Sequence, residues 1–301
     1  MKTFLHPLQN LAEMEAIYTK AKSNRGILEI SGCMESQKAH LIYGLSGLFP
    51  SHLILSEDEK SAKELYEDYR FYDKNVYYYP AKDLLFFQAD IHGNLLIRQR
   101  MRVIKALLEQ KENITVVTSI DGCMDYLQPL DKIEKQLIHF RNDSTLDMDK
   151  LKDALVHMGY ERVGQVEMPG QFSVRGGIVD IYSLTEENPW RIELWGDEID
   201  SIRTFDSQSQ RSLENLDEIT IYPATEQPAE KGGVSFLDYF AEKNSLVFLD
   251  EPNRLEENAR AVEEEFRQSC ENRQQKGEEN ISQNWMCRWE DLNHKLNNRN
   301  C

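Results

Sequence analysis

Gly32 and Lys38 stand at the spacing of the glycine and lysine in a nucleotide-binding P-loop. The P-loop pattern is G-x-x-x-x-G-K-[ST], in which the second glycine lets the backbone approach a phosphate and the hydroxyl binds Mg²⁺. In this sequence Gln37 replaces that glycine and Ala39 replaces the hydroxyl residue. We therefore interpret residues 32–39 as a degenerate P-loop without nucleotide-binding function. Lys38 is expected to be a solvated lysine at the start of a helix.

Two acidic residues, Asp250 and Glu251, follow the apolar run SLVFL and precede Pro252. Acids at the end of such a strand hold magnesium in Walker B motifs. Pro252 would stop a strand at the same point, so the pair can equally be two ordinary strand-end residues. We favour the second interpretation. No metal and no cofactor are expected.

The segment WRIELW points alternate side chains to opposite faces if it is a strand. Ile192 and Leu194 would then lie on the core side, while Arg191, Glu193 and Trp195 would share the other face. A tryptophan near an arginine on a polar face is typical of a protein-binding hot spot.

Arg175 and Gly176 belong to the run SVRGG, on a strand expected to neighbour WRIELW, where paired glycines allow a bulge or a close approach. Two alternatives remain open from the residues alone. Trp195 and the arginines form a docking surface, or Trp195 packs under the tail or the first domain while Arg191 merely pairs with Glu193.

The composition argues against nucleic-acid binding, and the sequence offers no motif for catalysis. The formal net charge is −17, which repels phosphate backbones, and no cluster of five or six basic residues occurs. The five cysteines are scattered and never in C-x-x-C spacing, and no apolar run approaches the roughly 20 residues of a membrane span. No histidine pair has ligand spacing and no nucleophile motif is present. We expect a cytoplasmic protein that is not an enzyme.

Strands and helices alternate over the first 130 residues, with expected strands GILEIS, HLILS, VYYYP and ITVVTSI. This alternation predicts an α/β fold, a parallel sheet with flanking helices. Ser56 is the expected cap of the helix that follows HLILS. From residue 131 a helix, MDKLKDALVHMGYERV, precedes closely spaced strands, which predicts a small inserted α+β domain with an antiparallel sheet.

Three segments follow from this pattern. Residues 1–130 are the first part of the α/β domain, residues 131–223 are the insertion, and residues 224–301 are the second part, in which SLVFL resumes the parallel sheet. The tail is expected to be helical with apolar residues on one face, namely Leu255, Ala259, Val262, Phe266 and Cys270, then Trp285, Trp289, Leu292 and Leu296.

The runs MPGQFSVRGGIVDIYSL and WRIELWGDEIDSIRTFDSQSQRS resemble the second domain of the transcription-repair coupling factors (Mfd) and of their relative UvrB. The family pattern is G-[EQ]-F-x-x-R-G-x-x-x-D-[IL]-[FY] followed by Y-R-[IL]-[ED]-F-F-x-D-E-I-D-S-[IL]-R-x-F-D-x-x-x-Q-R. The resemblance covers roughly residues 20 to 255. Departures are small: Gln171 replaces a glutamate, Trp195 replaces a phenylalanine and Ser183-Leu184 replaces a proline-containing turn.

This resemblance implies a degenerate P-loop, helicase-like domain interrupted by the inserted domain. It implies a non-catalytic module that recruits UvrA to stalled RNA polymerase for nucleotide excision repair. The positions that match Arg175, Arg191 and Trp195, with the adjacent Gly176, would bind UvrA. RNA polymerase and DNA would be bound only through C-terminal domains outside this chain, which is expected to be a fragment of a longer protein. The alternative is an ATP-binding fragment of a UvrB-like DNA repair helicase, which requires a glycine at 37 and a hydroxyl at 39.

Overall fold

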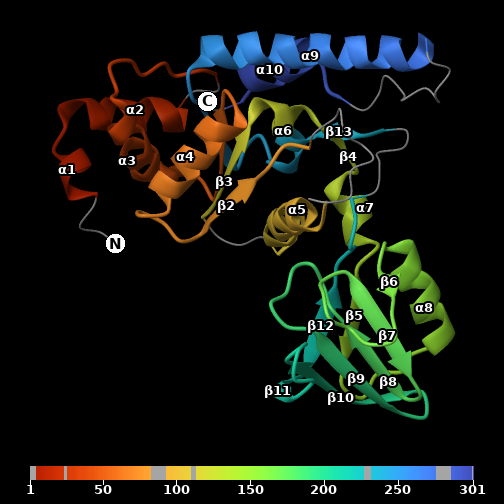
Figure 1. The fold of residues 1–301 in the computed structure, drawn as a ribbon. Coiled ribbons are helices and arrows are strands. Elements are labelled where there is room, and N and C mark those ends of the chain that lie inside the picture. The colour runs from red at the N-terminus through yellow and green to blue at the C-terminus, as the bar shows by residue number, and fades with distance from the viewer. Residues whose placement is uncertain are drawn as a thin grey trace. The chain divides into compact units, whose positions relative to one another are not determined.

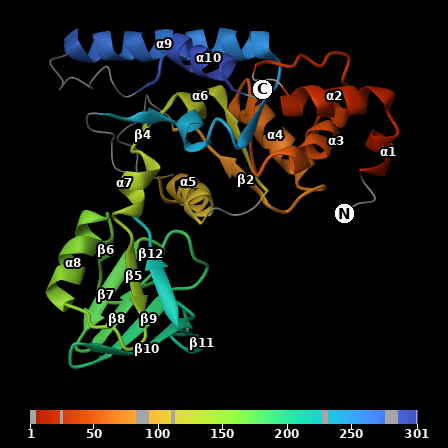
Figure 2. The ribbon, with the colours of Figure 1, turned by 180° about the vertical axis from the view of Figure 1, so that it is seen from behind.

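The computed structural model describes residues 5–23, 26–82, 93–109, 113–226, 232–275, 286–299 and 301 (Figures 1 and 2). The chain forms two compact units. Unit 1 comprises residues 1–88, 106–129 and 228–301, and unit 2 comprises residues 89–105 and 130–227. Unit 1 contains a parallel sheet flanked by helices and unit 2 a separate, mainly antiparallel sheet, which confirms the predicted mixed α/β fold. The domain boundaries at residues 130 and 223 stay a prediction.

The sheet of unit 1 has four strands in the order β14-β1-β3-β2. They are β14 (Ser245–Leu249), β1 (Ser51–Ser56), β3 (Ile114–Ser119) and β2 (Val76–Tyr79). All three pairings are parallel, with Leu53 of β1 opposite both Val247 and Val116. Because β1 and β3 are covered on both faces, their apolar runs are almost wholly buried. The return of β14 beside β1 confirms that SLVFL resumes the parallel sheet.

The helices of unit 1 include the predicted helix after HLILS and the predicted helical tail. They are α1 (His6–Gln9), α2 (Ala12–Ser23), α3 (Glu35–Leu45), η2 (Ser46–Leu48), α4 (Glu59–Tyr69), α6 (Ile120–Met124), η3 (Phe236–Tyr239), α9 (Pro252–Gln275) and α10 (Trp289–Asn297), with a short ladder of β4 (Tyr126–Leu127) and β13 (Val234–Ser235). The cap of α4 is Asp58, whose carboxylate accepts the Ser61 N–H at 2.7 Å. The prediction of Ser56 as the cap is wrong, because Ser56 is the buried last residue of β1.

Helices α9 and α10 lie side by side in both views (Figures 1 and 2). The buried residues of this pair are Leu255, Ala259, Phe266, Trp289, Leu292 and Leu296. The expected apolar face of the tail is thus confirmed for these residues, while Trp285 lies outside the described residues. Across the part of the chain that the structure describes, no helix has both the length and the apolar character needed to cross a membrane.

The predicted strand GILEIS is wrong. Gly26 N–H donates to the Arg299 carbonyl and Leu28 N–H donates to the Cys301 carbonyl, each at 2.8 Å. The segment therefore runs beside residues at the end of the chain and forms no named strand of the parallel sheet. A short apolar run becomes a sheet strand only when its backbone groups hydrogen-bond to the edge of that sheet. Here the backbone N–H groups of Gly26 and Leu28 bond to residues 299 and 301 instead.

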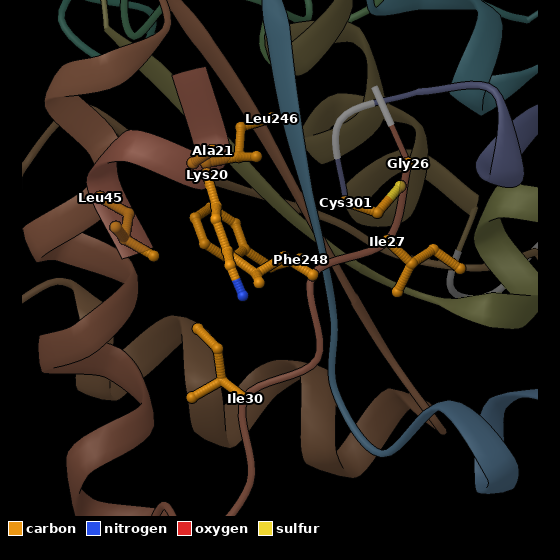
Figure 3. A pocket seen from close by; sticks show the side chains of 10 residues that line it. Lys20, Ala21, Gly26, Ile27, Ile30, Leu45, Leu246, Phe248 and Cys301 are labelled. Atoms are coloured by element: carbon orange, nitrogen blue, oxygen red, sulfur yellow. The ribbon is translucent and has the colours of Figure 1, made fainter. Parts of the chain in front are cut away.

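A cavity of about 190 Å³ lies between this segment and β14 (Figure 3). Its lining residues are Lys20, Ala21, Gly26, Ile27, Leu28, Ile30, Leu45, Leu246, Phe248 and Cys301. Ile27 is 53% exposed, so the segment does not bury its apolar side chains as a strand on the edge of β14 would. The cavity shares no lining residue with the degenerate P-loop.

The main sheet of unit 2 has six strands in the order β11-β10-β9-β8-β7-β6. They are β11 (Ser212–Leu216), β10 (Glu198–Phe205), β9 (Trp190–Trp195), β8 (Ile178–Ile181), β7 (Gln171–Arg175) and β6 (Glu161–Arg162). Their pairings are antiparallel except between β6 and β7. A second ladder joins β5 (Ile138–Arg141) to β12 (Glu218–Ile221). The helices are α7 (Leu130–Glu134) and α8 (Met148–His157), of which α8 was predicted.

Helix α5 (Gly93–Leu108) contributes its residues up to 105 to unit 2, although the sequence pattern groups it with the first segment of the α/β domain. Arg98 donates to the Glu186 carbonyl at 2.9 Å and Lys105 contacts the Glu186 carboxylate at 2.5 Å. The buried Arg100 pairs with Glu226 at 2.6 Å. These contacts attach α5 to the loop before β9 and to the residues after β12.

Candidate functional site

Two tight turns lie at one end of the six-stranded sheet, because β8 and β9 are neighbours and each is joined to its hairpin partner there. Each turn has a glycine at its first central position, Gly176 with φ +60° and Gly196 with φ +65°. A type II′ hairpin turn needs a positive φ at this position, which glycine adopts without steric cost. We call residues 175–178 and 195–198 the hairpin end.

Trp195 is the last residue of β9 and is 83% exposed. Arg175 is the last residue of β7, and its side chain is 47% exposed. The indole of Trp195 is therefore not packed in the core of unit 2, and the alternative in which it packs under the tail or the first domain stays open. Ile192 is fully buried as predicted, whereas Leu194, expected on the same core side, is only half-buried.

The sequence analysis expected Arg191 to be exposed, and this is wrong: its side chain is only 13% accessible. Its Nε donates to Oδ1 of Asp180 at 2.7 Å and its Nη2 donates to Oδ2 at 2.8 Å. Arg175 donates from Nη2 to the same Oδ2 at 2.7 Å. Neither guanidinium is free to turn wholly towards a partner, because the buried carboxylate of Asp180 holds both. We call Arg175, Asp180 and Arg191 the Asp180 cluster.

Arg191 has two further contacts that fix its place. Its guanidinium lies over the Phe205 ring, 4.3 Å from the centroid, and its Nη2 donates to Oε1 of Gln210 at 3.0 Å. The hydrogen bonds to Asp180 raise the pKa of Arg191 and outweigh the opposing effect of burial. Arg191 does not pair with Glu193, whose carboxylate accepts from Arg203 at 3.0 Å.

The strand register explains why these three residues meet. Asp180 lies directly opposite Arg191 in the β8–β9 ladder, while Arg175 reaches it diagonally from β7. Asp180 is 1% exposed in its side chain, between the buried Val179 and Ile181. Within this cluster, two cations and one carboxylate leave one excess positive charge. The sequence analysis missed Asp180 as a site residue, although a charged residue within the apolar run IVDI was the available signal.

Lys38 of the degenerate P-loop is paired rather than solvated, so that expectation is wrong. Its Nζ lies 2.7 Å from Asp250 Oδ1, 2.7 Å from Glu35 Oε1 and 3.1 Å from Glu251 Oε1, and the side chain is 15% exposed. Burial lowers the pKa of Lys38, but the hydrogen bonds to Asp250, Glu35 and Glu251 outweigh it and raise the pKa overall. The two strand-end acids Asp250 and Glu251 thus neutralise the lysine.

The other positions of the loop have intramolecular roles. Gln37 accepts the Met34 N–H through Oε1 at 3.2 Å at the start of α3. Ala39 is 3% exposed and belongs to the hydrophobic core that includes Ile42 and Ile54. Gly32 adopts φ +81°, a conformation suited to glycine. Over the described ranges no group of three or more histidine, cysteine, aspartate or glutamate side chains is arranged to hold a metal ion.

Comparison with known proteins identifies the region around the hairpin end. Residues 138–226 match the UvrB interaction domain family. The chain is 37% identical to the transcription-repair-coupling factor of Bacillus subtilis strain 168 over 222 residues, which is 67% of this chain and 19% of that protein. The corresponding proteins of Staphylococcus haemolyticus and Staphylococcus aureus strain MRSA252 are 37% and 36% identical over 151 and 153 residues, covering 50% and 51% of this chain and 13% of each relative.

The chain spans less than a fifth of the length of these curated relatives. The domain match contains Arg175, Gly176, Arg191 and Trp195 together with Asp180. The resemblance that the sequence motifs indicated is confirmed. Residues 138–226 are similar to the UvrB interaction domain, and about two thirds of the chain is similar to a transcription-repair-coupling factor.

Proposed function

We propose that this chain is a non-catalytic UvrB-like module that recruits UvrA during transcription-coupled nucleotide excision repair. The observation that carries the proposal is the exposed indole of Trp195, 83% accessible, at the hairpin end of a UvrB interaction domain. An indole this exposed contributes little to the folded core, so its position is not explained by folding. Tryptophan and arginine are enriched at binding hot spots, which explains it.

The hairpin end supplies two kinds of contact. The indole of Trp195 would fill an apolar pocket of UvrA, and burying a large aromatic side chain removes about 150 to 250 Å² from water. The N–H groups of Arg175 that point away from Asp180 would pair with UvrA carboxylates. Arg191 is mostly buried, so it would not contact UvrA directly. It would instead hold Asp180, which in turn holds Arg175.

Two features support the absence of nucleotide chemistry. Lys38, the residue that would meet a phosphate, is held by three carboxylates, and position 39 carries a buried alanine without a hydroxyl. The alternative, an ATP-binding fragment of a UvrB-like repair helicase, would have to break these ion pairs before a triphosphate could enter. We further propose that RNA polymerase and DNA are bound by parts of a longer protein outside this chain, which acts in the cytoplasm.

Equilibrium binding to purified UvrA tests the proposal. The parent chain should bind, and Trp195→Ala and Arg175→Ala should each weaken binding. The loss for Trp195→Ala should be about 30-fold, since truncating a hot-spot residue costs about 2 kcal/mol or more. Val156→Ala and Arg141→Ala, which alter another exposed apolar and another exposed arginine residue of unit 2, serve as matched controls. A parent chain that does not bind, or a Trp195→Ala chain that binds as well as the parent, would refute the proposal.

A further inference from the structure

We infer that Asp180 is a positioning residue for the UvrA-binding surface: its buried carboxylate holds the half-exposed guanidinium of Arg175 in the orientation that UvrA meets. The inference rests on the proposed docking of UvrA at the hairpin end and assigns a role to a residue that touches no partner. Asp180 itself is 1% exposed and cannot meet UvrA directly.

Arg175 needs such an anchor because of where it stands. It is the last residue of β7, next to the Gly176 turn, and its side chain is nearly half exposed. A free arginine loses much of its rotamer entropy when a partner immobilises it. The charge-assisted hydrogen bond from Nη2 to Asp180 Oδ2, at 2.7 Å, restricts the guanidinium before any partner arrives. Part of the entropic cost of binding is therefore removed in the free protein.

Arg191 holds the carboxylate of Asp180 in place. Its two parallel hydrogen bonds to Asp180 fix both carboxylate oxygens, and its own guanidinium is fixed by Phe205 and Gln210. One carboxylate between two guanidiniums leaves an excess positive charge. Arg175 is 47% exposed and Arg191 only 13%, so this charge is presented to solvent at Arg175. The ligand chemistry that matches it is a carboxylate of UvrA.

A double-mutant cycle between Asp180 and Arg175 distinguishes positioning from a general structural role. Asp180→Asn keeps the size of the side chain but removes the charge that anchors Arg175. In the parent chain it should weaken UvrA binding about five- to tenfold, within the usual range for coupled neighbours. In the Arg175→Ala chain the same substitution should have no further effect, because the residue that it positions is already gone.

Two further variants complete the experiment. Glu186→Gln removes another partly buried, cation-paired carboxylate of unit 2, away from the hairpin end, and should leave binding unchanged. Arg191→Lys retains the charge but loses the two parallel hydrogen bonds to Asp180, so it should weaken UvrA binding less than Asp180→Asn does. This loss, too, should occur only when Arg175 is present. This variant keeps the inference testable if Asp180→Asn fails to fold, which circular dichroism would show.

An equal loss on Asp180→Asn with and without Arg175 would overturn the inference, because the effect would then be structural. Unchanged binding of Asp180→Asn, alongside clear losses in Trp195→Ala and Arg175→Ala, would overturn the inference while leaving the proposed function intact. Parent-like binding by Trp195→Ala would instead refute the proposed docking surface, and the inference would fall with it.

Discussion

Replacing Arg191 with methionine is expected to destabilise unit 2, because the change leaves the buried carboxylate of Asp180 with one cation instead of two. Removing one partner of a buried ion pair costs about 3 to 5 kcal/mol. Here Arg175 still donates to Oδ2, and Arg191 is not wholly buried, so we expect a smaller loss of about 2 to 3 kcal/mol. Methionine retains an unbranched apolar stem beside Phe205, so the loss reports mainly the missing charge and hydrogen bonds.

Urea and thermal unfolding followed by circular dichroism measure this loss. With about 3 °C in Tm for each kcal/mol in a domain of this size, the Arg191→Met chain should melt about 6 to 9 °C below the parent. Adding Asp180→Asn removes the poorly compensated buried charge. A neutral amide is less costly to leave partly unpaired than a carboxylate, so the double variant should recover stability relative to Arg191→Met.

Either of two results would refute this reasoning. An Arg191→Met chain within about 0.5 kcal/mol of the parent would show that Asp180 does not depend on Arg191, since changes of that size are typical of unconstrained surface positions. A double variant less stable than Arg191→Met would show that the charge of Asp180 stabilises the sheet even without its main partner.

Three further predictions concern unit 1 and the net charge. Titration with Mg-ATP should give no heat above dilution up to millimolar nucleotide, because Lys38 is neutralised by acids; a micromolar Kd would contradict this. At physiological salt the chain, with its net charge of −17, should not shift duplex or single-stranded DNA, and a salt-dependent shift would reveal a basic groove. Burial, aided by the negative charge of Glu59, raises the pKa of Asp121 from 3.8 to about 6. Since the folded pKa lies above the unfolded one, ionised Asp121 costs stability fully above pH 6, and the cost fades as the pH falls towards 4. Asp121→Asn should therefore raise the free energy of unfolding at pH 7 by about 1 to 2 kcal/mol and hardly change it at pH 4; an equal gain at both values would contradict the assignment.

The strands of both units were largely predictable because their apolar runs have clear limits. WRIELW and EIDSIRTFD end at turns with glycine or polar residues, and HLILS and ITVVTSI are apolar runs that only a doubly covered parallel strand can bury. GILEIS was not predictable in the same way. Its pattern is that of a strand, but the backbone partners of Gly26 and Leu28 are residues 299 and 301, far away in sequence.

The exposure of Trp195 followed from alternation along one strand, whereas the burial of Arg191 did not. Alternation places Arg191 and Trp195 on one face but says nothing about what lies beside each of them across the sheet. The position of Asp180 opposite Arg191 depends on the β8–β9 register, and the cover provided by Phe205 and Gln210 comes from residues 14 and 19 positions later. The pairing of Lys38 with Asp250 likewise joins residues more than 200 positions apart.

Hydrogen–deuterium exchange of the 301-residue chain, with and without saturating purified UvrA, tests the central claim most directly. If UvrA docks at the hairpin end, exchange should slow in peptides that cover residues 172–179 and 193–199. Peptides from α9 in unit 1 should exchange at the same rate in both samples. Protection confined to unit 1, with unchanged exchange at both hairpin turns, would contradict the account.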